Sequence, residues 1–193
     1  MARLFVAIEL SDSVKDVLSR LQTGLKGSKW VSRENLHLTI RFLGEVSENE
    51  VEDIDAALRK VRCKPFSLEF HGLDVFSSGE RVRSLWIGIS SKVDIVYLKK
   101  RVDGTLFRVG VRPDVRRYVP HVTLARLRGR QQTLAHYFEN VDLNKKLKLN
   151  DIGCNLGQFW KGLKNREMNR IGYNGFDYEE TYLKEAIKVF PEL

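Results

Sequence analysis

Apolar positions divide the first two thirds of this 193-residue chain into strands and helices. β-Prone runs, continuous or alternating, predict strands at residues 3–10, 36–43, 66–73, 82–89 and 118–127, because side chains in a strand repeat every second residue. Apolar residues at helical spacing predict helices at 14–25, 51–61 and 93–109. The predicted order is β-α-β-α-β-β-α-β.

This order favours an α+β fold with antiparallel sheets and helices outside, because strict strand–helix alternation is missing. Ser47 and Glu50 form a capping-box pattern at the second helix, and Pro65 prevents its extension. Beyond Leu127 the pattern is weaker. We expect a short helix at 131–139, a strand at 145–152 and a helix at 181–190. No low-complexity linker interrupts the chain, so we predict one domain over residues 1–193.

A four-residue pattern, His-apolar-Thr-apolar, occurs twice, at residues 37–40 and 121–124. The chain has four histidines, so finding two of them in this pattern is a chance event of about one in a few hundred. Each copy lies in a predicted strand, so its His and Thr share a face. The four side chains placed in this way are His37, Thr39, His121 and Thr123.

Two arginines extend these motifs. Arg41 has the same strand parity as His37, whereas Arg126 has the opposite parity to His121 and would need a bulge or a strand end to reach it. Seven arginines and one acid lie between Arg108 and Arg130, in a chain of net charge +8. This run indicates either a phosphate-facing surface or an ordinary solvated one.

Paired histidines suit phosphodiester chemistry. One group takes a proton from the nucleophile and another gives one to the leaving oxygen on the opposite side of phosphorus. Imidazole can do both near neutrality, and threonine hydroxyls can donate to the non-bridging oxygens. The spacing offers no zinc-type ligand set and no Gly-x-Ser-x-Gly, and Cys63 and Cys154 stand alone. We therefore expect no metal and no cofactor.

Longer stretches around the motifs carry a family resemblance. They are residues 3–8, 30–31, 34–44, 82–88 and 120–126. They resemble the 2H phosphoesterase superfamily, and more narrowly the bacterial and archaeal RNA 2′,3′-cyclic phosphodiesterases, long named 2′-5′ RNA ligases. The resemblance implies a bilobal, pseudo-twofold α+β fold whose antiparallel sheets line a central cleft, and metal-free hydrolysis of RNA 2′,3′-cyclic phosphate ends to 2′-phosphate. It implies that His37 is the proton donor, that His121 is the base, and that Thr39 and Thr123 hold the phosphate.

The resemblance leaves alternatives open. Residues 151–182 depart from the family pattern, so we treat them as a divergent C-terminal segment. Ligation of 2′-5′ ends at the same site, and non-catalytic binding of nucleotides or RNA ends, are the competing functions. We expect RNA with 2′,3′-cyclic phosphate ends or small cyclic nucleotides as partners, a monomer, and a cytoplasmic location. No apolar run is long enough to span a membrane.

Overall fold

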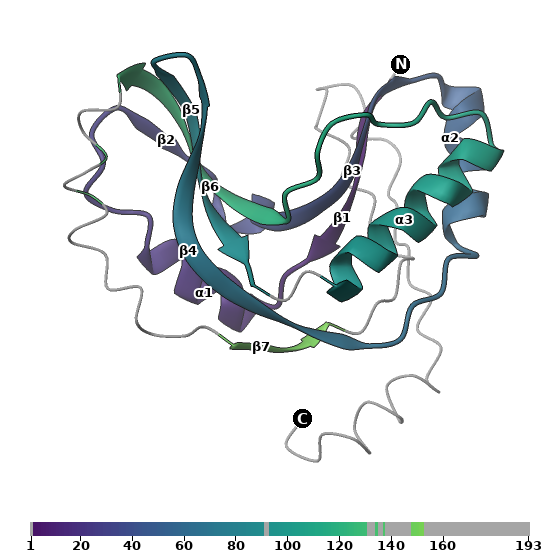
Figure 1. Cartoon of the computed structure of the whole chain (residues 1–193), viewed down its shortest axis with the longest axis horizontal. Helices are drawn as coiled ribbons and strands as arrows, with labels where there is room; N and C mark the ends of the chain where they lie inside the picture. The colour runs from purple at the N-terminus through teal and green to yellow at the C-terminus, as the bar shows by residue number, and fades with distance from the viewer. Residues whose placement is uncertain (1, 91–92, 131–133, 135–136, 138–147, 153–193) are drawn as a thin grey trace.

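The computed structural model describes residues 2–90, 93–130, 134, 137 and 148–152 (Figure 1). The helix expected at 131–139 is described only at Leu134 and Tyr137. The helix expected at 181–190 and nearly all of the divergent segment 151–182 lie outside the described residues. Their predictions therefore stay predictions.

Seven strands of the described chain form one sheet in the order β1-β3-β6-β5-β4-β7, with β2 paired to β6. Every pairing between them is antiparallel, which confirms the α+β expectation. The short β2 was not predicted, because three residues carry too little periodicity. The strands are β1 Ala2–Glu9, β2 Ser28–Trp30, β3 His37–Val46, β4 Phe66–Ser78, β5 Arg81–Ile89, β6 His121–Arg130 and β7 Lys148–Ile152.

The sheet bends into two arms that meet at the two motif strands. Figure 1 shows β1 and β3 in one arm and β2, β4 and β5 in the other. β3 pairs with β6 only at Leu38 and Val122, whereas β1–β3 and β5–β6 are long pairings. The two arms are thus joined by the short β3–β6 pairing, and both motifs lie at this junction.

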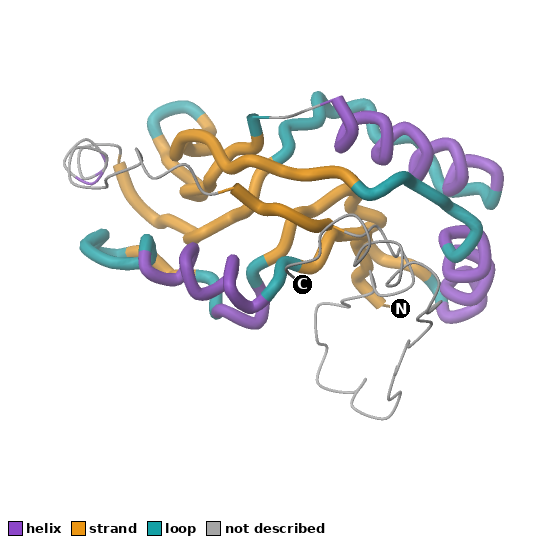
Figure 2. Tube along the Cα trace, turned by 90° about the horizontal axis from the view of Figure 1, so that it is seen from below, coloured by secondary structure: helices purple, strands orange, loops and turns teal. Residues whose placement is uncertain are grey.

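Within the described residues there are three α-helices and a short 3-10 helix, η1 Arg33–Asn35. Figure 2 shows the helices lying outside the strands. They are α1 Asp12–Arg20, α2 Glu48–Leu58 and α3 Val93–Arg108. Leu18 of α1, Ile54 of α2 and Leu98 of α3 belong to one hydrophobic core with the sheet. None of the described helices is long and apolar enough to cross a membrane.

The topology repeats around the β3–β6 pairing. β5, α3 and β6 follow one another as strand, helix and motif strand. β1, α1 and β3 come in the same order, with β2 and η1 between α1 and β3. β1 lies on the outer side of β3, and β5 lies on the outer side of β6. The repeat relates the two motifs by an approximate twofold rotation through the Leu38–Val122 pair.

Candidate active site

Both motifs meet at the centre of the sheet. Leu38 and Val122 are opposite each other in β3 and β6, and both are fully buried. Continuing this antiparallel register by one residue in each direction brings His37 opposite Thr123 and Thr39 opposite His121. Successive side chains in a strand alternate between faces, so these four lie on the face away from the two buried apolar residues. Each of the four is half-buried. The structure therefore brings together the four motif residues that the sequence predicts.

The two imidazoles are held in the same way. Nδ1 of His37 lies 2.6 Å from the carbonyl oxygen of Asn35, and Nδ1 of His121 lies 2.6 Å from the carbonyl oxygen of Val119. A carbonyl oxygen only accepts, so each Nδ1 carries a hydrogen and donates it. Nε2 is then left as the proton-exchanging atom of each ring. In both motifs the acceptor is the residue two positions before the histidine, so the local geometry repeats with the fold.

Aromatic rings surround His121. Phe76 meets its ring edge-on at a centroid distance of 4.8 Å, and Trp86 lies at 5.5 Å. Burial lowers the pKa of His121 below its usual 6.5, although the hydrogen bond to Val119 acts in the opposite direction. Desolvation disfavours the charged form of an imidazole. His121 is thus neutral at neutral pH, which suits a group that must accept a proton.

The surroundings of His37 differ. Phe5 of β1 stacks on its ring at 4.7 Å with an interplanar angle of 24°. Glu9 is its partner in the β1–β3 ladder, and the Glu9 carboxylate accepts a hydrogen bond of 3.0 Å from Lys15. On the other arm Gly88 occupies the corresponding position beside His121. A Cβ at Gly88 would lie 2.8 Å from the His71 carbonyl oxygen and 3.2 Å from the Trp86 ring, which explains the glycine.

A β-bulge in β3 places Arg41 on the face opposite to the one that the sequence predicts. Ala7 pairs with Thr39 and Val6 with Arg41, so Ile40 is an extra residue in β3. Ala7 and Val6 point to opposite faces, and therefore Thr39 and Arg41 do too. The prediction that Arg41 shares the face of His37 is wrong. Phe42, the ladder partner of Phe5, lies on the face of His37 instead.

Arg41 is buried, with 6% exposure, on the helix side of the sheet. Its Nη1 lies 3.2 Å from a carboxylate oxygen of Asp114, its Nε lies 3.7 Å from Asp103, and its Nη2 donates to the Arg112 carbonyl oxygen. Burial lowers its pKa and Asp103 opposes this effect, but a guanidinium stays charged in proteins. These contacts tie β3 to α3 and to the segment between α3 and β6.

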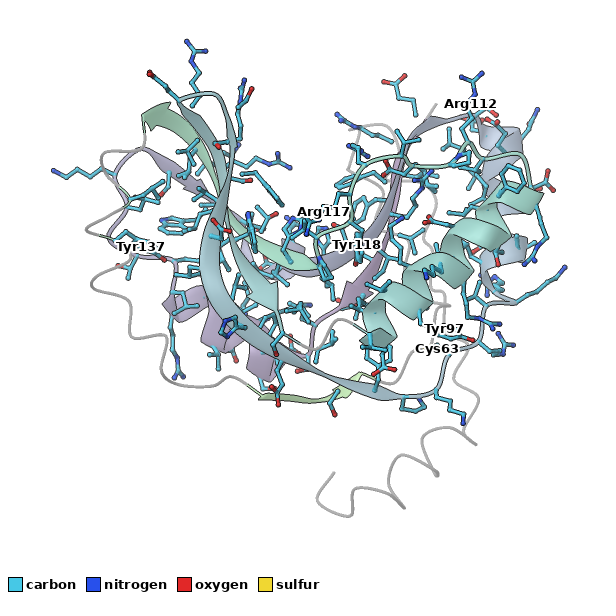
Figure 3. The ribbon with its side chains drawn as sticks, in the orientation of Figure 1. Cys63, Tyr97, Arg112, Arg117, Tyr118 and Tyr137 are labelled. Atoms are coloured by element: carbon cyan, nitrogen blue, oxygen red, sulfur yellow. The ribbon has the colours of Figure 1, made fainter. Side chains whose placement is uncertain are left out.

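Tyr118 makes a second tie between that segment and the first motif. Its hydroxyl donates to the carbonyl oxygen of Thr39 at 3.0 Å. Burial raises the pKa of Tyr118, so the hydroxyl stays protonated and remains a donor. Figure 3 shows Tyr118 and its neighbour Arg117 between the two arms. Arg117 is exposed there, which both interpretations of the arginine run predict.

Alternation alone would place Arg126 on the face opposite to His121. A bulge in β6 brings it to the face that carries His121 and Thr123. Thr123 pairs with Trp86, Ala125 with Leu85 and Arg126 with Ser84, so Leu124 is the extra residue. Trp86 and Ser84 are two residues apart on β5 and share a face, and therefore Thr123 and Arg126 share one as well. Arg126 is exposed.

Sequence reasoning missed the aromatic members of the site. Phe5, Phe76 and Trp86 touch the two histidines, and Phe42 lies beside Phe5 at 5.9 Å. No local pattern marks them, because cross-strand pairing brings them to the motifs. Among the residues that the structure describes, no three His, Cys, Asp or Glu side chains gather in a way that could hold a metal ion.

Comparison with known proteins gives a consistent result. The model of the family described as LigT like Phosphoesterase matches residues 8–86. The RNA 2′,3′-cyclic phosphodiesterase of Methanothermobacter thermautotrophicus is 33% identical over 133 residues, which cover 66% of this chain and 72% of the relative. The protein of the same name from Archaeoglobus fulgidus is 35% identical over 137 residues, 69% and 77% of the two chains.

Solved structures show the same similarity. Escherichia coli LigT complexed with 3′-AMP is 25% identical, with a TM-score of 0.60 over 68% of this chain and 76% of that chain. The protein TT0787 of Thermus thermophilus is 26% identical, also with a TM-score of 0.60, over 66% and 75% of the two chains.

Proposed function

The chain belongs to the LigT-like phosphoesterase family, and from that membership we propose that it hydrolyses the 2′,3′-cyclic phosphate ends of RNA to 2′-phosphates. The phosphoesterase class follows from the family. The RNA end as substrate is our proposal, supported by the names of the curated relatives. The observation that carries it is the arrangement of two His-Thr pairs on one face, each with its histidine Nδ1 bonded to a backbone carbonyl oxygen.

We propose an in-line mechanism with His121 as base and His37 as acid. Water attacks phosphorus, and His121 Nε2 takes its proton as the new P–O bond forms. The P–O3′ bond breaks on the opposite side, and His37 Nε2 delivers its proton to the departing O3′. The lowered pKa of His121 supports this division, because a base must be neutral before it can accept a proton. The product keeps its phosphate on O2′.

Threonine hydroxyls and one arginine complete the proposed site. Thr39 and Thr123 donate to the non-bridging oxygens, where negative charge is concentrated in the transition state. Arg126 on the same face adds a permanent positive charge near the phosphate. Arg41 has a different place in this proposal. Its guanidinium is held among Asp103, Asp114 and the Arg112 carbonyl, so it positions the segment that leads into His121.

The test is hydrolysis of an RNA oligonucleotide that ends in a 2′,3′-cyclic phosphate. His37→Ala and His121→Ala should each lower kcat/KM by about 10²- to 10⁴-fold, the range for losing a general acid or base. A chelator should leave the wild-type rate unchanged, and thermal unfolding followed by circular dichroism checks that both variants fold. Turnover at the wild-type rate in either variant would contradict the proposal.

Two further measurements separate hydrolysis from the competing functions. Incubating the enzyme with paired transfer-RNA halves and looking for a joined product distinguishes ligation from hydrolysis. Binding of the cyclic-phosphate end by wild-type protein without turnover would favour a non-catalytic binding module.

A further inference from the structure

Much of the arginine run lies outside the two motifs, between the end of α3 and the start of β6. Residues 108–117, which we call the arginine segment, contain four arginines and one acid, Asp114. All four arginine side chains are exposed. The proposed hydrolysis uses none of these side chains, so the segment needs a separate explanation.

Asp114 does not neutralise the arginine segment. Nη1 of the buried Arg41 lies 3.2 Å from one of its carboxylate oxygens, and Arg116 donates to both oxygens at 2.9 Å. One carboxylate therefore faces two guanidinium groups. Within the described residues neither Arg112 nor Arg117 forms an ion pair. The segment thus presents a net positive charge to solvent.

The backbone of the arginine segment is held against the first motif strand. The Arg112 carbonyl oxygen accepts from Arg41 of β3, and Tyr118, directly after the segment, donates to the Thr39 carbonyl oxygen. The arginine side chains therefore start from fixed positions, which lowers the ordering cost of binding a ligand. Figure 3 shows Arg117 between the two arms and Arg112 at the top of the arm that holds β1 and β3.

The proposed mechanism indicates over which arm an RNA strand lies. O3′ is the leaving oxygen and stays bonded to the ribose, so the ribose and the nucleotides 5′ to it lie on the acid's side of phosphorus. Water enters from the opposite side. With His37 of β3 as acid, the strand leaves the site over the arm to which Arg41 and Tyr118 tie the arginine segment.

We propose that the arginine segment binds the phosphates of the RNA strand directly 5′ to the cyclic phosphate, so that the protein prefers an RNA chain to a mononucleotide. The side on which the strand lies rests on the proposed function. Guanidinium groups pair with phosphate oxygens and read no base, so this surface selects for a nucleic-acid chain without selecting its sequence.

The neighbouring surface has the opposite charge. α2 lies beside α3 in Figure 1, and its first turns expose four acidic side chains, Glu48, Glu50, Glu52 and Asp53. A polyanion is repelled there. Favourable contact on this arm is therefore restricted to the arginine segment.

The first test compares two substrates that share the terminal nucleotide. One is a short oligoadenylate that ends in a 2′,3′-cyclic phosphate, and the other is adenosine 2′,3′-cyclic phosphate. Arg112→Gln removes a charge but leaves the carbonyl that Arg41 binds. It should raise KM for the oligoadenylate by about 2- to 5-fold at low salt, the worth of one exposed ion pair, and leave KM for the mononucleotide unchanged. Equal rises for both substrates would overturn the inference.

The second test measures binding without chemistry at the RNA end. A fluorescein-labelled oligoadenylate with a plain 3′-hydroxyl is titrated by fluorescence anisotropy at several salt concentrations. The logarithm of the association constant falls with the logarithm of salt concentration, by about 0.7 for each phosphate contact to a single strand. Arg112→Gln should make this slope shallower by about 0.7, and combining it with Arg117→Gln should do so by about 1.4.

Two exposed arginines outside the arginine segment serve as comparisons. Arg20→Gln, in the last turn of α1, is the matched control and should change neither the slope nor either KM. Arg83→Gln, on β5, tests the other arm. A shallower slope in Arg83→Gln together with an unchanged slope in Arg112→Gln would overturn the inference, because the strand would then lie on that arm.

The two tests distinguish this inference from the proposed function. If wild-type protein hydrolyses neither substrate but the salt slope still depends on Arg112, the proposed function fails and the RNA-binding surface stands. If hydrolysis proceeds and the slope does not respond to Arg112→Gln, the inference alone fails.

Discussion

Removing the buried Arg41 guanidinium is the change that best separates positioning from substrate binding. Arg41→Met keeps the length of the side chain and leaves Asp103 and Asp114 without their shared cation. Breaking a fully buried ion pair costs about 3–5 kcal/mol. Here the two aspartate side chains are 32% and 17% exposed, and Lys99 and Arg116 still contact them. We therefore expect the free energy of unfolding to fall by about 2–3 kcal/mol, below that range.

Urea unfolding followed by circular dichroism measures this loss, and steady-state hydrolysis measures the consequence for the site. We expect kcat to fall, because the segment that Arg41 holds leads directly into His121. Arg33→Met is the matched control, since Arg33 also contacts two aspartates, Asp12 and Asp16, but at the surface. It should change stability little. If Arg41→Met kept the wild-type stability and kcat while raising KM, Arg41 would be a substrate-binding residue and our reasoning would be refuted.

Other predictions concern protonation and single hydrogen bonds. The pH profile of kcat/KM should have an acid limb below pH 6.5, because activity is lost as pH falls through the lowered pKa of His121. Phe76→Ser admits water to His121 and should move that limb to higher pH. A limb that does not move would contradict the role of burial in lowering this pKa. Thr39→Val and Thr123→Val should each lower kcat by about 10²-fold with normal thermal unfolding, as loss of an oxyanion donor does. Tyr118→Phe should lower the free energy of unfolding in urea by about 1 kcal/mol, the worth of one hydrogen bond.

The features of the fold that short-range sequence patterns determine were predicted correctly. The capping box of Ser47 and Glu50 is present, with the Glu50 carboxylate accepting from the Ser47 amide at 3.0 Å, and α2 begins directly after Ser47. Strict alternation also placed His37 and Thr39 on one face, because the two residues lie before the bulge. The family membership expected from the motif stretches is confirmed by the family model and by the curated relatives.

Alternation along β3 failed to predict which face the side chains take beyond the bulge. Counting by twos from Leu38 places Phe42 in the core and Arg41 on the site face, but one extra residue at Ile40 exchanges them. A bulge is set by the partner strand and by what the bulged residues meet across the fold. Here Arg41 meets Asp103 and Asp114, both more than sixty residues away in sequence. No window of sequence around residue 41 contains that information.

The proposed roles of His37 as acid and His121 as base cannot be assigned from the motifs themselves. Both rings donate Nδ1 to the carbonyl two residues earlier, both are followed by a threonine, and both strands bulge after it. A symmetric pair would give two groups of equal proton affinity, and a site with no preferred direction. The difference must therefore arise from the surroundings. Phe76 and Trp86 desolvate His121, whereas His37 has one stacked ring and a glutamate across the ladder. Exchange of these neighbours, and not of the motif residues, is what should reverse the acid and the base.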